Sequence, residues 1–174
     1  MTTYTHLESP LGELLLTSHG EKLTGLYFAD RPHALKIIPG WIKREDTAIF
    51  SQVRLQLEEY ASGEWEKFDL PIALAGTPFQ MRVWQEISLI PFGETVTYGE
   101  LARRAGSPGA DRAAGTAAAR NPLCWIVPCH RVVAHDGSLA GYAGGLGRKE
   151  ALLAFESARA SGLPVPLDFQ PFAI

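Results

Sequence analysis

The stretch that decides the fold and the chemistry of this chain is Pro128-Cys129-His130-Arg131-Val132. A proline precedes the cysteine, an imidazole follows it directly, and two β-branched valines come next. This pattern is typical of a thiol that is displayed for chemistry. Asn121-Pro122 lies just before the stretch, and the glycine-rich segment Gly141-Tyr142-Ala143-Gly144-Gly145 lies just after it.

The composition limits the class of protein. The 174 residues are 46% hydrophobic and 20% charged, which is ordinary for one fair-sized globular domain or two small ones. No basic cluster followed by an apolar run opens the chain, and no stretch approaches the roughly 18 apolar residues of a membrane helix. We therefore expect a cytoplasmic protein, nuclear if its source is eukaryotic, with no membrane partner. Its two cysteines, Cys124 and Cys129, exclude a disulfide framework and fit a reducing compartment.

Charge is distributed unevenly along the chain. The net charge is −3, but residues 101–131 carry five arginines against a single acidic residue, Asp111. This block, which ends just after the cysteine, is the only basic part of the sequence. It indicates either a nucleic-acid surface or an ordinary solvated one, and charge alone does not decide between them.

Residues 1–76 are predicted to form a small antiparallel-sheet domain of the α+β class. Segments 2–8, 12–18 and 22–28 are rich in strand-forming residues and are separated by turns, which indicates a three-stranded meander. Apolar residues at helical spacing predict a helix over 47–61, ending at Gly63. Residues 71–76 would be an extended connector. The histidines at 6, 19 and 33 have no cysteine nearby, so we expect surface or turn positions.

Residues 77–174 are predicted to form a mostly helical domain. Thr77-Pro78-Phe79-Gln80 is a capping box with proline at the first helical position, which predicts a helix from 78 to about 89. A second capping box, Thr97-Tyr98-Gly99-Glu100, predicts a helix to Arg104. A third helix, 110–120, would end at Asn121-Pro122, where asparagine tolerates the left-handed conformation. The last two helices have the proportions of a helix-turn-helix, although a plain αα-hairpin is commoner.

The third helix has one face that bears nothing longer than a methyl group. Such a face can pack closely on another helix, or it can approach a DNA minor groove, which is roughly 6 Å wide. Arg112, near the start of this helix, would then point into the groove. The face consists of Ala110, Ala113, Ala114, Ala117 and Ala118.

Three segments follow this helix. Residues 123–127 are an apolar run, predicted to be buried and extended, that brings Cys129 to its site. Residues 135–137 are a predicted turn, and the glycine-rich loop 141–147 would let a flat ligand approach the backbone. An amphipathic helix is predicted over 148–160.

A cysteine nucleophile needs activation, because a free thiol is only a few per cent thiolate at neutral pH. His130 is the adjacent base, but neighbours in an extended chain point to opposite sides. A bridging water is therefore the simpler link between Cys129 and His130. Glu156, on the last helix, is predicted to orient the imidazole, and Glu150 is the competitor.

Other interpretations stay open from the residues alone. Cysteine often only packs, which is the prediction for Cys124. A zinc site formed by Cys124, Cys129, His130 and His135 has poorly suited spacing. A cysteine hydrolase could use the same Cys-His-Glu set for acyl transfer.

The motifs together resemble a known family. Arg120-Asn121-Pro122, Pro128-Cys129-His130-Arg131-Val132 and the segment 141–146 are similar to the signature of the O6-alkylguanine-DNA alkyltransferases, also called methylated-DNA–protein-cysteine methyltransferases. The resemblance runs in register from about Phe79 to Glu156, through Pro91-Phe92-Gly93-Glu94-Thr95-Val96-Thr97-Tyr98. The first 76 residues resemble the ribonuclease H-like domain of this family only in outline.

This resemblance implies a single-use DNA repair protein that needs no cofactor and no metal. Cys129, activated by His130 through water and held by Glu156, would take the alkyl group irreversibly from O6-alkylguanine, and O4-alkylthymine is a further candidate substrate. The protein would bind double-stranded DNA through the minor groove and flip the damaged base out. We expect a monomer, with clustering along the duplex as an alternative.

The resemblance also assigns roles to particular residues. Arg112 would fill the gap left by the flipped base, with Ala110, Ala113, Ala114 and Ala117 beside it on the DNA-binding face. Tyr98 would push on the phosphate, face the base and supply a proton to the departing guanine. Asn121 would fix the turn before the cysteine. The residues expected to line the pocket are Val132, Tyr142, Ala143 and Gly144.

Two positions depart from the family pattern. Ala143 stands where some members have serine, and Cys124 takes a lid position that is often proline, which leaves the tolerance of bulky alkyl groups open. A rival from another class is a module that binds the lesion without repairing it. Such relatives replace the cysteine, and this chain keeps it.

Overall fold

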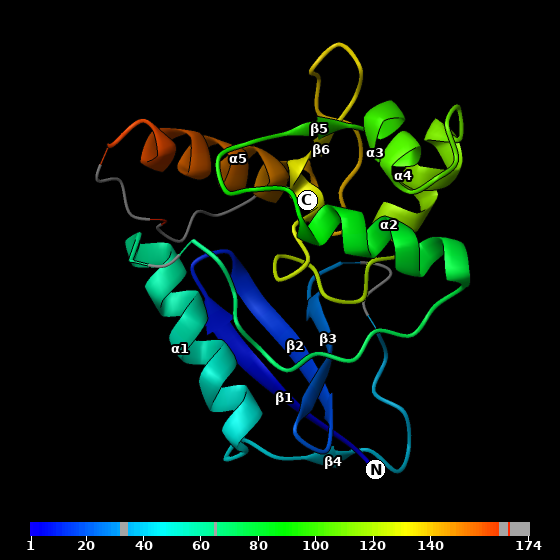
Figure 1. Cartoon of the computed structure of the whole chain (residues 1–174). Helices are drawn as coiled ribbons and strands as arrows, with labels where there is room; N and C mark the ends of the chain where they lie inside the picture. The colour runs from blue at the N-terminus through cyan, green and yellow to red at the C-terminus, as the bar shows by residue number, and fades with distance from the viewer. Residues whose placement is uncertain (32–34, 65, 164–166, 168–174) are drawn as a thin grey trace.

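A four-stranded sheet forms the first part of the molecule (Figure 1). The computed structural model describes residues 1–31, 35–64, 66–163 and 167, so His33 lies outside the described residues. Strands β1 (Thr2–Ser9), β2 (Gly12–His19) and β3 (Lys22–Phe28) pair antiparallel, which confirms the predicted meander. A short strand that the sequence did not predict, β4 (Ile42–Lys43), pairs parallel with β1 and gives the order β3-β2-β1-β4. His6 and His19 are exposed, as expected.

Helix α1 (Ala48–Ser62) covers the sheet from one side (Figure 1). The Thr47 side chain accepts a hydrogen bond from the Phe50 amide at its start. Gly63 ends it in the left-handed conformation, at φ 81°, as the sequence predicted. The apolar residues at helical spacing are buried against the sheet, and Tyr60 among them reaches toward the second part of the molecule.

The second part begins with three helices. Helix α2 (Pro78–Ser88) begins with the predicted capping box, in which both hydrogen bonds between Thr77 and Gln80 are present. Helices α3 (Tyr98–Arg104) and α4 (Asp111–Ala119) are the two helices predicted to form the helix-turn-helix, and they pack on each other and on α2. The second capping box is only half formed. The Thr97 hydroxyl accepts from the Glu100 amide, but the Glu100 carboxylate binds the guanidinium groups of α3 instead of the helix start.

The segment between α4 and the cysteine differs from the prediction. Residues 123–127 are buried, except for the half-buried Ile126, and they are not extended, because Cys124 bridges to Val127 in a tight turn. The left-handed residue is Trp125, at φ 74°, and it is the only described non-glycine residue with positive φ. Asn121 therefore does not end α4 by a left-handed conformation. The chain then enters a 3-10 helix, η1 (Cys129–Arg131), and strand β6 (Val132–Val133), which pairs parallel with β5 (Val96–Thr97).

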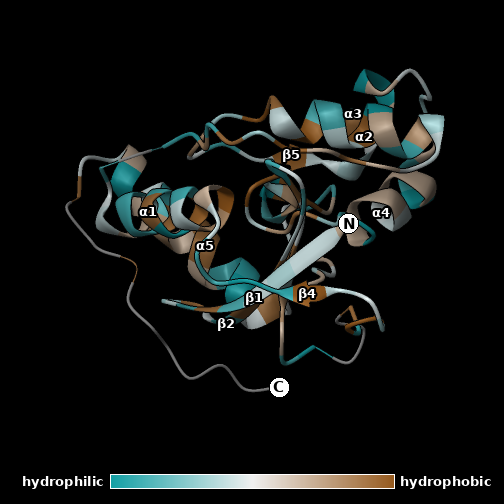
Figure 2. Ribbon diagram, turned by 90° about the horizontal axis from the view of Figure 1, so that it is seen from below, coloured by the Kyte–Doolittle hydropathy of each residue, from teal (hydrophilic) through white to brown (hydrophobic). Residues whose placement is uncertain are grey.

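The two parts share one hydrophobic core, and backbone hydrogen bonds connect them. The Leu26 amide in β3 donates to the Pro122 carbonyl at 2.8 Å, and the Leu26 carbonyl accepts from the Cys124 amide at 3.2 Å. The last helix, α5 (Leu146–Ala160), lies across the top of the sheet region in Figure 1. In Figure 2 the helices carry both teal and brown segments, as expected of helices that bury one face.

Arg148 of α5 clamps the second part to the first. Its guanidinium donates to both carboxylate oxygens of Asp30 at 2.8 and 2.7 Å, to the Leu11 carbonyl at 2.7 Å and to the Gly144 carbonyl at 2.9 Å. It also lies 4.4 Å from the centre of the Phe28 ring. The guanidinium is buried, whereas the Asp30 side chain is 45% exposed. No helix of the described residues is both long and apolar enough to cross a membrane.

We expect Asp30→Asn to lower the free energy of unfolding at pH 7. The Arg148 side chain is buried, so the substitution removes the carboxylate that neutralises a buried guanidinium. The exposure of Asp30 reduces the effect to about 1 to 2 kcal/mol. Urea unfolding measures it, with Glu45→Gln as the matched control.

Glu45 forms an ion pair with Lys43 in which both side chains are well exposed. Its removal should change the free energy of unfolding by less than about 0.5 kcal/mol. Equal effects of the two substitutions would contradict the clamp.

Candidate active site

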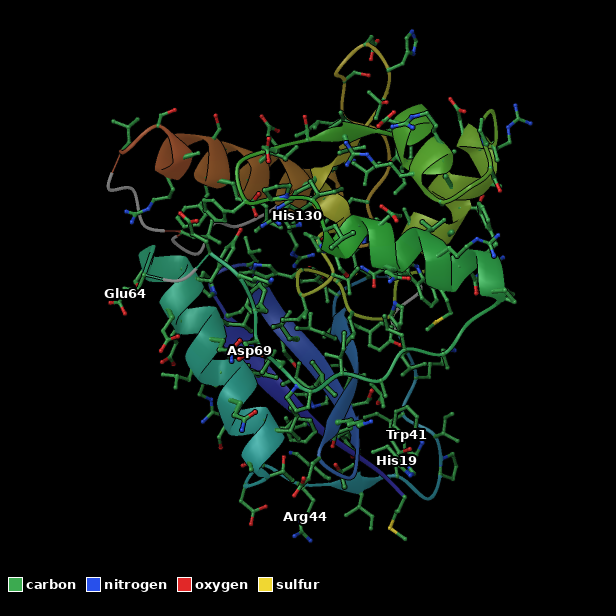
Figure 3. The ribbon with its side chains drawn as sticks, in the orientation of Figure 1. His19, Trp41, Arg44, Glu64, Asp69 and His130 are labelled. Carbon is green, nitrogen blue, oxygen red and sulfur yellow. The ribbon has the colours of Figure 1, made fainter. Side chains whose placement is uncertain are left out.

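The 3-10 helix η1 holds the cysteine, the histidine and the arginine of the motif in one buried turn. Cys129, His130 and Arg131 are 4%, 0% and 6% exposed. Consecutive residues of a 3-10 helix point about 120° apart, because it has about three residues per turn. The sequence led us to expect Cys129 and His130 on opposite sides of an extended strand. The 3-10 helix does not place them in this way. Figure 3 shows His130 inside the molecule, far from the exposed His19.

Asn121 fixes the turn that precedes the cysteine. Its side-chain amide donates to the Val127 carbonyl at 2.8 Å and to the Cys129 sulfur at 3.2 Å. Its side-chain oxygen accepts from the Leu123 amide at 2.9 Å. One buried amide thus joins the end of α4, the tight turn and the sulfur. The predicted position of Asn121 at the hinge agrees with this geometry, although hydrogen bonds achieve it and not backbone conformation.

Glu156 of α5 is the common partner of the other two η1 side chains. Its Oε1 lies 2.8 Å from His130 Nε2, and Arg131 donates to Oε1 and Oε2 at 2.9 Å each. The Tyr60 hydroxyl of α1 donates to Oε1 at 2.6 Å. The predicted partner of the imidazole is therefore in place, and the competitor Glu150 is exposed. The contribution of Tyr60 was missed, and no local sequence signal indicates it.

The electrostatics of this cluster define the state of the imidazole. Burial works against ionisation of Glu156, but His130 and Arg131 more than offset it and lower its pKa to about 2. Burial lowers the pKa of His130, despite the nearby carboxylate. A neutral imidazole at pH 7 that donates from Nε2 leaves Nδ1 as a free base. This buried Nδ1 has no hydrogen-bond partner among the described residues.

The sulfur of Cys129 is in an activating environment. A hydrogen bond with Cys124 lowers its pKa, burial opposes this, and Asn121 and Lys149 lower it further. The Lys149 ammonium is buried and donates to the carbonyls of Val132 at 2.6 Å and Ala140 at 2.8 Å. Lys149 was not among the predicted residues. Its place in an amphipathic helix, next to Arg148, gives no local signal that its ammonium is buried.

A cavity of ≈ 990 Å³ opens beside this cluster. Of the predicted site residues it is lined by Tyr98, Arg112, Asn121, Tyr142 and Ala143. Cys124 also lines it, and the sheet domain contributes Tyr27, Phe28 and Arg31, which the sequence did not suggest.

Two residues predicted to line the pocket do not. Val132 is fully buried in β6, and Gly144 packs against the Phe28 ring. Cys129 itself lies beneath the cavity, next to Asn121 and Cys124, which are part of the lining.

The alanine face of α4 is mainly a packing surface. Ala114 and Ala117 are buried, and the Trp84 indole of α2 donates to the Ala117 carbonyl at 2.8 Å. The prediction that they belong to a DNA-binding face is therefore wrong, because close packing of α4 on α2 uses them. Ala113 is exposed and Ala110 is half-buried. The residues that α4 presents to the cavity are Asp111, Arg112, Gly115, Thr116 and Ala119.

Tyr98, at the start of α3, lies on the cavity wall. Its hydroxyl lies 3.5 Å from the Gly141 carbonyl. Burial, with a contribution from Cys129, raises its pKa, so the phenol keeps its proton at neutral pH. The zinc alternative has little support, because His135 is exposed and His130 Nε2 is bound to Glu156. No group of three or more metal-binding side chains occurs in the described part of the chain.

Comparison with known proteins gives matches over both parts of the chain. The sequence model of the 6-O-methylguanine DNA methyltransferase, DNA binding domain, matches residues 78–158. The model of the 6-O-methylguanine DNA methyltransferase, ribonuclease-like domain, matches residues 2–74.

Similar relatives are methylated-DNA–protein-cysteine methyltransferases. That of Mycobacterium leprae is 45% identical over 150 residues, which is 86% of this chain and 89% of the relative. That of Methanosarcina acetivorans is 44% identical over 153 residues, 88% of this chain and 97% of the relative. A crystal structure of Mycobacterium tuberculosis OGT in complex with DNA has a TM-score of 0.84 at 41% identity, and covers 94% of this chain and 95% of that one.

We expect Glu156→Gln to lower the free energy of unfolding at pH 7 by about 3 kcal/mol, since it removes the carboxylate that neutralises the buried Arg131. The folded-state pKa of about 2 lies below the ordinary 4.5. The stabilisation is therefore present above pH 4.5 and is lost as the pH falls toward 2. The difference between wild type and variant should shrink over that range in urea unfolding.

Glu150→Gln, at an exposed position on the same helix, is the control and should change stability by less than about 0.5 kcal/mol. A difference between wild type and Glu156→Gln that stays constant from pH 7 to pH 2 would contradict the role of this charge.

Proposed function

The chain belongs to the 6-O-methylguanine DNA methyltransferase family, and on this basis we propose that Cys129 is the residue that accepts the alkyl group. The activity is the repair of O6-methylguanine in DNA, with transfer of the methyl group to a protein cysteine. The observation that carries the assignment is the Asn121 hydrogen bond to the Cys129 sulfur, which holds that sulfur in an activated state below the cavity.

The choice between the two cysteines follows from their environments. The thiolate is the nucleophile, and the pKa of Cys129 is lowered by its neighbours. The pKa of Cys124 is raised well above its ordinary value, chiefly by its hydrogen bond with Cys129 and by burial. Of the two, Cys129 therefore loses its proton first and attacks.

The transfer is a single displacement. The Cys129 sulfur attacks the alkyl carbon, the carbon–sulfur bond forms, and the bond from that carbon to O6 breaks with its electron pair going to guanine. The neutral His130 accepts the thiol proton at Nδ1 through a bridging water, which suits a buried and otherwise unpartnered nitrogen. Glu156 keeps the imidazole in this tautomer. Tyr98 donates its phenolic proton to the departing guanine.

The substrate base reaches this site by leaving the duplex. An atom inside a stacked duplex is out of reach of a buried sulfur, so the nucleotide must be flipped into the cavity. Arg112 is exposed on the first turn of α4 and lines the cavity, so it is placed to occupy the gap in the base stack. Ala110 and Ala113, which have no long side chain, let α4 approach a narrow minor groove.

The product thioether ends the activity of the molecule. A thioether is a poor alkyl donor, because the group that would have to leave is a thiolate. The described groups around Cys129 are the Asn121 amide, an imidazole, a buried ammonium and the Cys124 thiol, whose raised pKa keeps it protonated and weakly nucleophilic. We infer one turnover per molecule, on O6-alkylguanine and on O4-alkylthymine where the cavity accepts it.

We expect the intact protein to gain one methyl group when it is mixed with an oligonucleotide that carries O6-methylguanine. Intact mass spectrometry measures the gain, and peptide mapping should place it on Cys129. Cys129→Ser and an undamaged oligonucleotide are the controls and should give no gain. Tight binding without a mass change would identify a lesion-binding module, and a methyl group on Cys124 would reassign the acceptor.

We also expect Arg112→Ala to slow repair of duplex DNA by at least about tenfold, while the rate with free O6-benzylguanine changes less than about twofold. Only the duplex requires base flipping, which costs a few kcal/mol. Arg54→Ala, at an exposed arginine on α1, is the matched control and should leave both rates unchanged. Equal losses on the two substrates would remove the flipping role.

A further inference from the structure

The hydroxyl of Tyr142 is a buried polar group of the active site that the mechanism above does not use. Like His130 Nδ1, it has no hydrogen-bond partner among the described residues. Tyr142 lines the cavity and is 8% exposed, but its hydroxyl oxygen is buried. The hydroxyl is therefore turned into the protein and away from the open part of the cavity.

Packing holds the Tyr142 ring beside the imidazole. The centres of the Tyr142 and His130 rings are 6.3 Å apart and their planes cross at 78°, which is an edge-to-face arrangement. The Phe28 ring also meets Tyr142 edge to face, with the ring centres 6.4 Å apart. A Cβ at Gly144 would lie 2.7 Å from both the Tyr142 and Phe28 rings, so glycine at this position leaves the room that they need. The two unpartnered atoms thus belong to neighbouring side chains of fixed position.

These two atoms complement each other as donor and acceptor. A neutral imidazole that donates from Nε2 to Glu156 can only accept at Nδ1, whereas the phenolic hydroxyl of Tyr142 can donate. No direct hydrogen bond joins the two in the described part of the chain, and leaving either one dry carries a desolvation cost. A buried water typically binds about three such polar groups. One water between the two side chains would remove both costs.

We propose that the Tyr142 hydroxyl holds the water that carries the proton from Cys129 to His130. The proposal rests on the proposed function, in which this relay activates the acceptor. The water oxygen accepts from the Cys129 thiol and from the Tyr142 hydroxyl, and one of its hydrogens is donated to His130 Nδ1. On activation the water gives that proton to Nδ1 and takes the thiol proton, so one proton moves from sulfur to nitrogen and the water is regenerated. Tyr142 keeps its own proton and is a positioning residue.

The charges around Tyr142 keep its hydroxyl protonated. Burial, followed by Cys124 and Cys129, raises the pKa of Tyr142 well above its ordinary value. Two further titratable groups face it, Tyr60 of α1, which adds to the rise, and Arg148 of α5, which opposes it. The hydroxyl therefore stays a donor at the pH at which the acceptor thiol ionises.

A crystal structure of the wild-type protein tests the water site directly. We expect a water molecule at hydrogen-bond distance from Tyr142 Oη, His130 Nδ1 and Cys129 Sγ, and we expect Tyr142→Phe to lose or displace it. A hydroxyl that binds no water, or a water that does not reach Nδ1, would overturn the proposal. The crystal structure needs no alkyl transfer, so this failure is distinguishable from failure of the proposed function, in which wild type itself gains no alkyl group on Cys129.

The kinetic test compares wild type with Tyr142→Phe, which removes the hydroxyl and keeps the ring. We expect the second-order rate constant with free O6-benzylguanine to fall about tenfold at pH 7, because the relay to His130 loses its positioned water. At about pH 10 the rate constant should return to within about twofold of wild type, since the thiol then ionises without the relay. Tyr4→Phe, on strand β1 of the sheet, is the matched control and should leave both rate constants unchanged.

Three kinetic results would overturn the proposal. An unchanged rate constant at pH 7 would show that the hydroxyl has no part in the relay, and an equal loss at both pH values would show that it only shapes the cavity. The third is an equal loss from Tyr142→Phe in wild type and in a His130→Gln background, where a hydroxyl that acts through the imidazole should have no further effect. Thermal unfolding checks that each variant is folded, and where one is not, the wild-type crystal structure decides.

Discussion

One buried carboxylate holds the active site together. Glu156 receives hydrogen bonds from His130, Arg131 and Tyr60, which come from the 3-10 helix and from α1. A buried charge with so many donors is stable only while they all stay in place. This single anion therefore links the imidazole of η1, the helix α5 that carries it and the helix α1 of the sheet domain.

The sequence predicted the parts of the fold that local signals determine. The meander, α1 with its glycine stop and α2 with its capping box were all confirmed, because caps and periodicity act within a few residues. The choice of Glu156 over Glu150 as the partner of His130 agrees with the structure. Helical periodicity places the two carboxylates at different positions around α5, and only Glu156 is buried beside the imidazole. The contact between Tyr60 and Glu156 spans 96 positions and leaves no local pattern.

The errors have a common cause, which is that tertiary packing overrides local preference. The apolar run 123–127 folds into a turn because Leu26 of the sheet pairs with it, and Trp125 takes the left-handed conformation there instead of Asn121. Ala114 and Ala117 of α4 are buried by its contact with α2, so they are not on the surface that could meet DNA. Lys149 is buried because backbone carbonyls of two earlier segments, at Val132 and Ala140, accept hydrogen bonds from its ammonium, and no pattern within its own helix indicates this.

The pairing of Leu26 with the turn before the cysteine has a mechanical consequence. The Cys124 amide donates a hydrogen bond to the Leu26 carbonyl of β3, and buried side chains of the shared core lie around the turn that leads to Cys129. Close-packed interiors transmit displacement and do not absorb it. An alkyl group added to a sulfur that is 4% exposed must displace its neighbours, among them Asn121, and the turn that follows Asn121 is hydrogen-bonded to β3. Alkylation of Cys129 should therefore loosen the contact with the sheet domain, which also carries Tyr60 and part of the cavity wall.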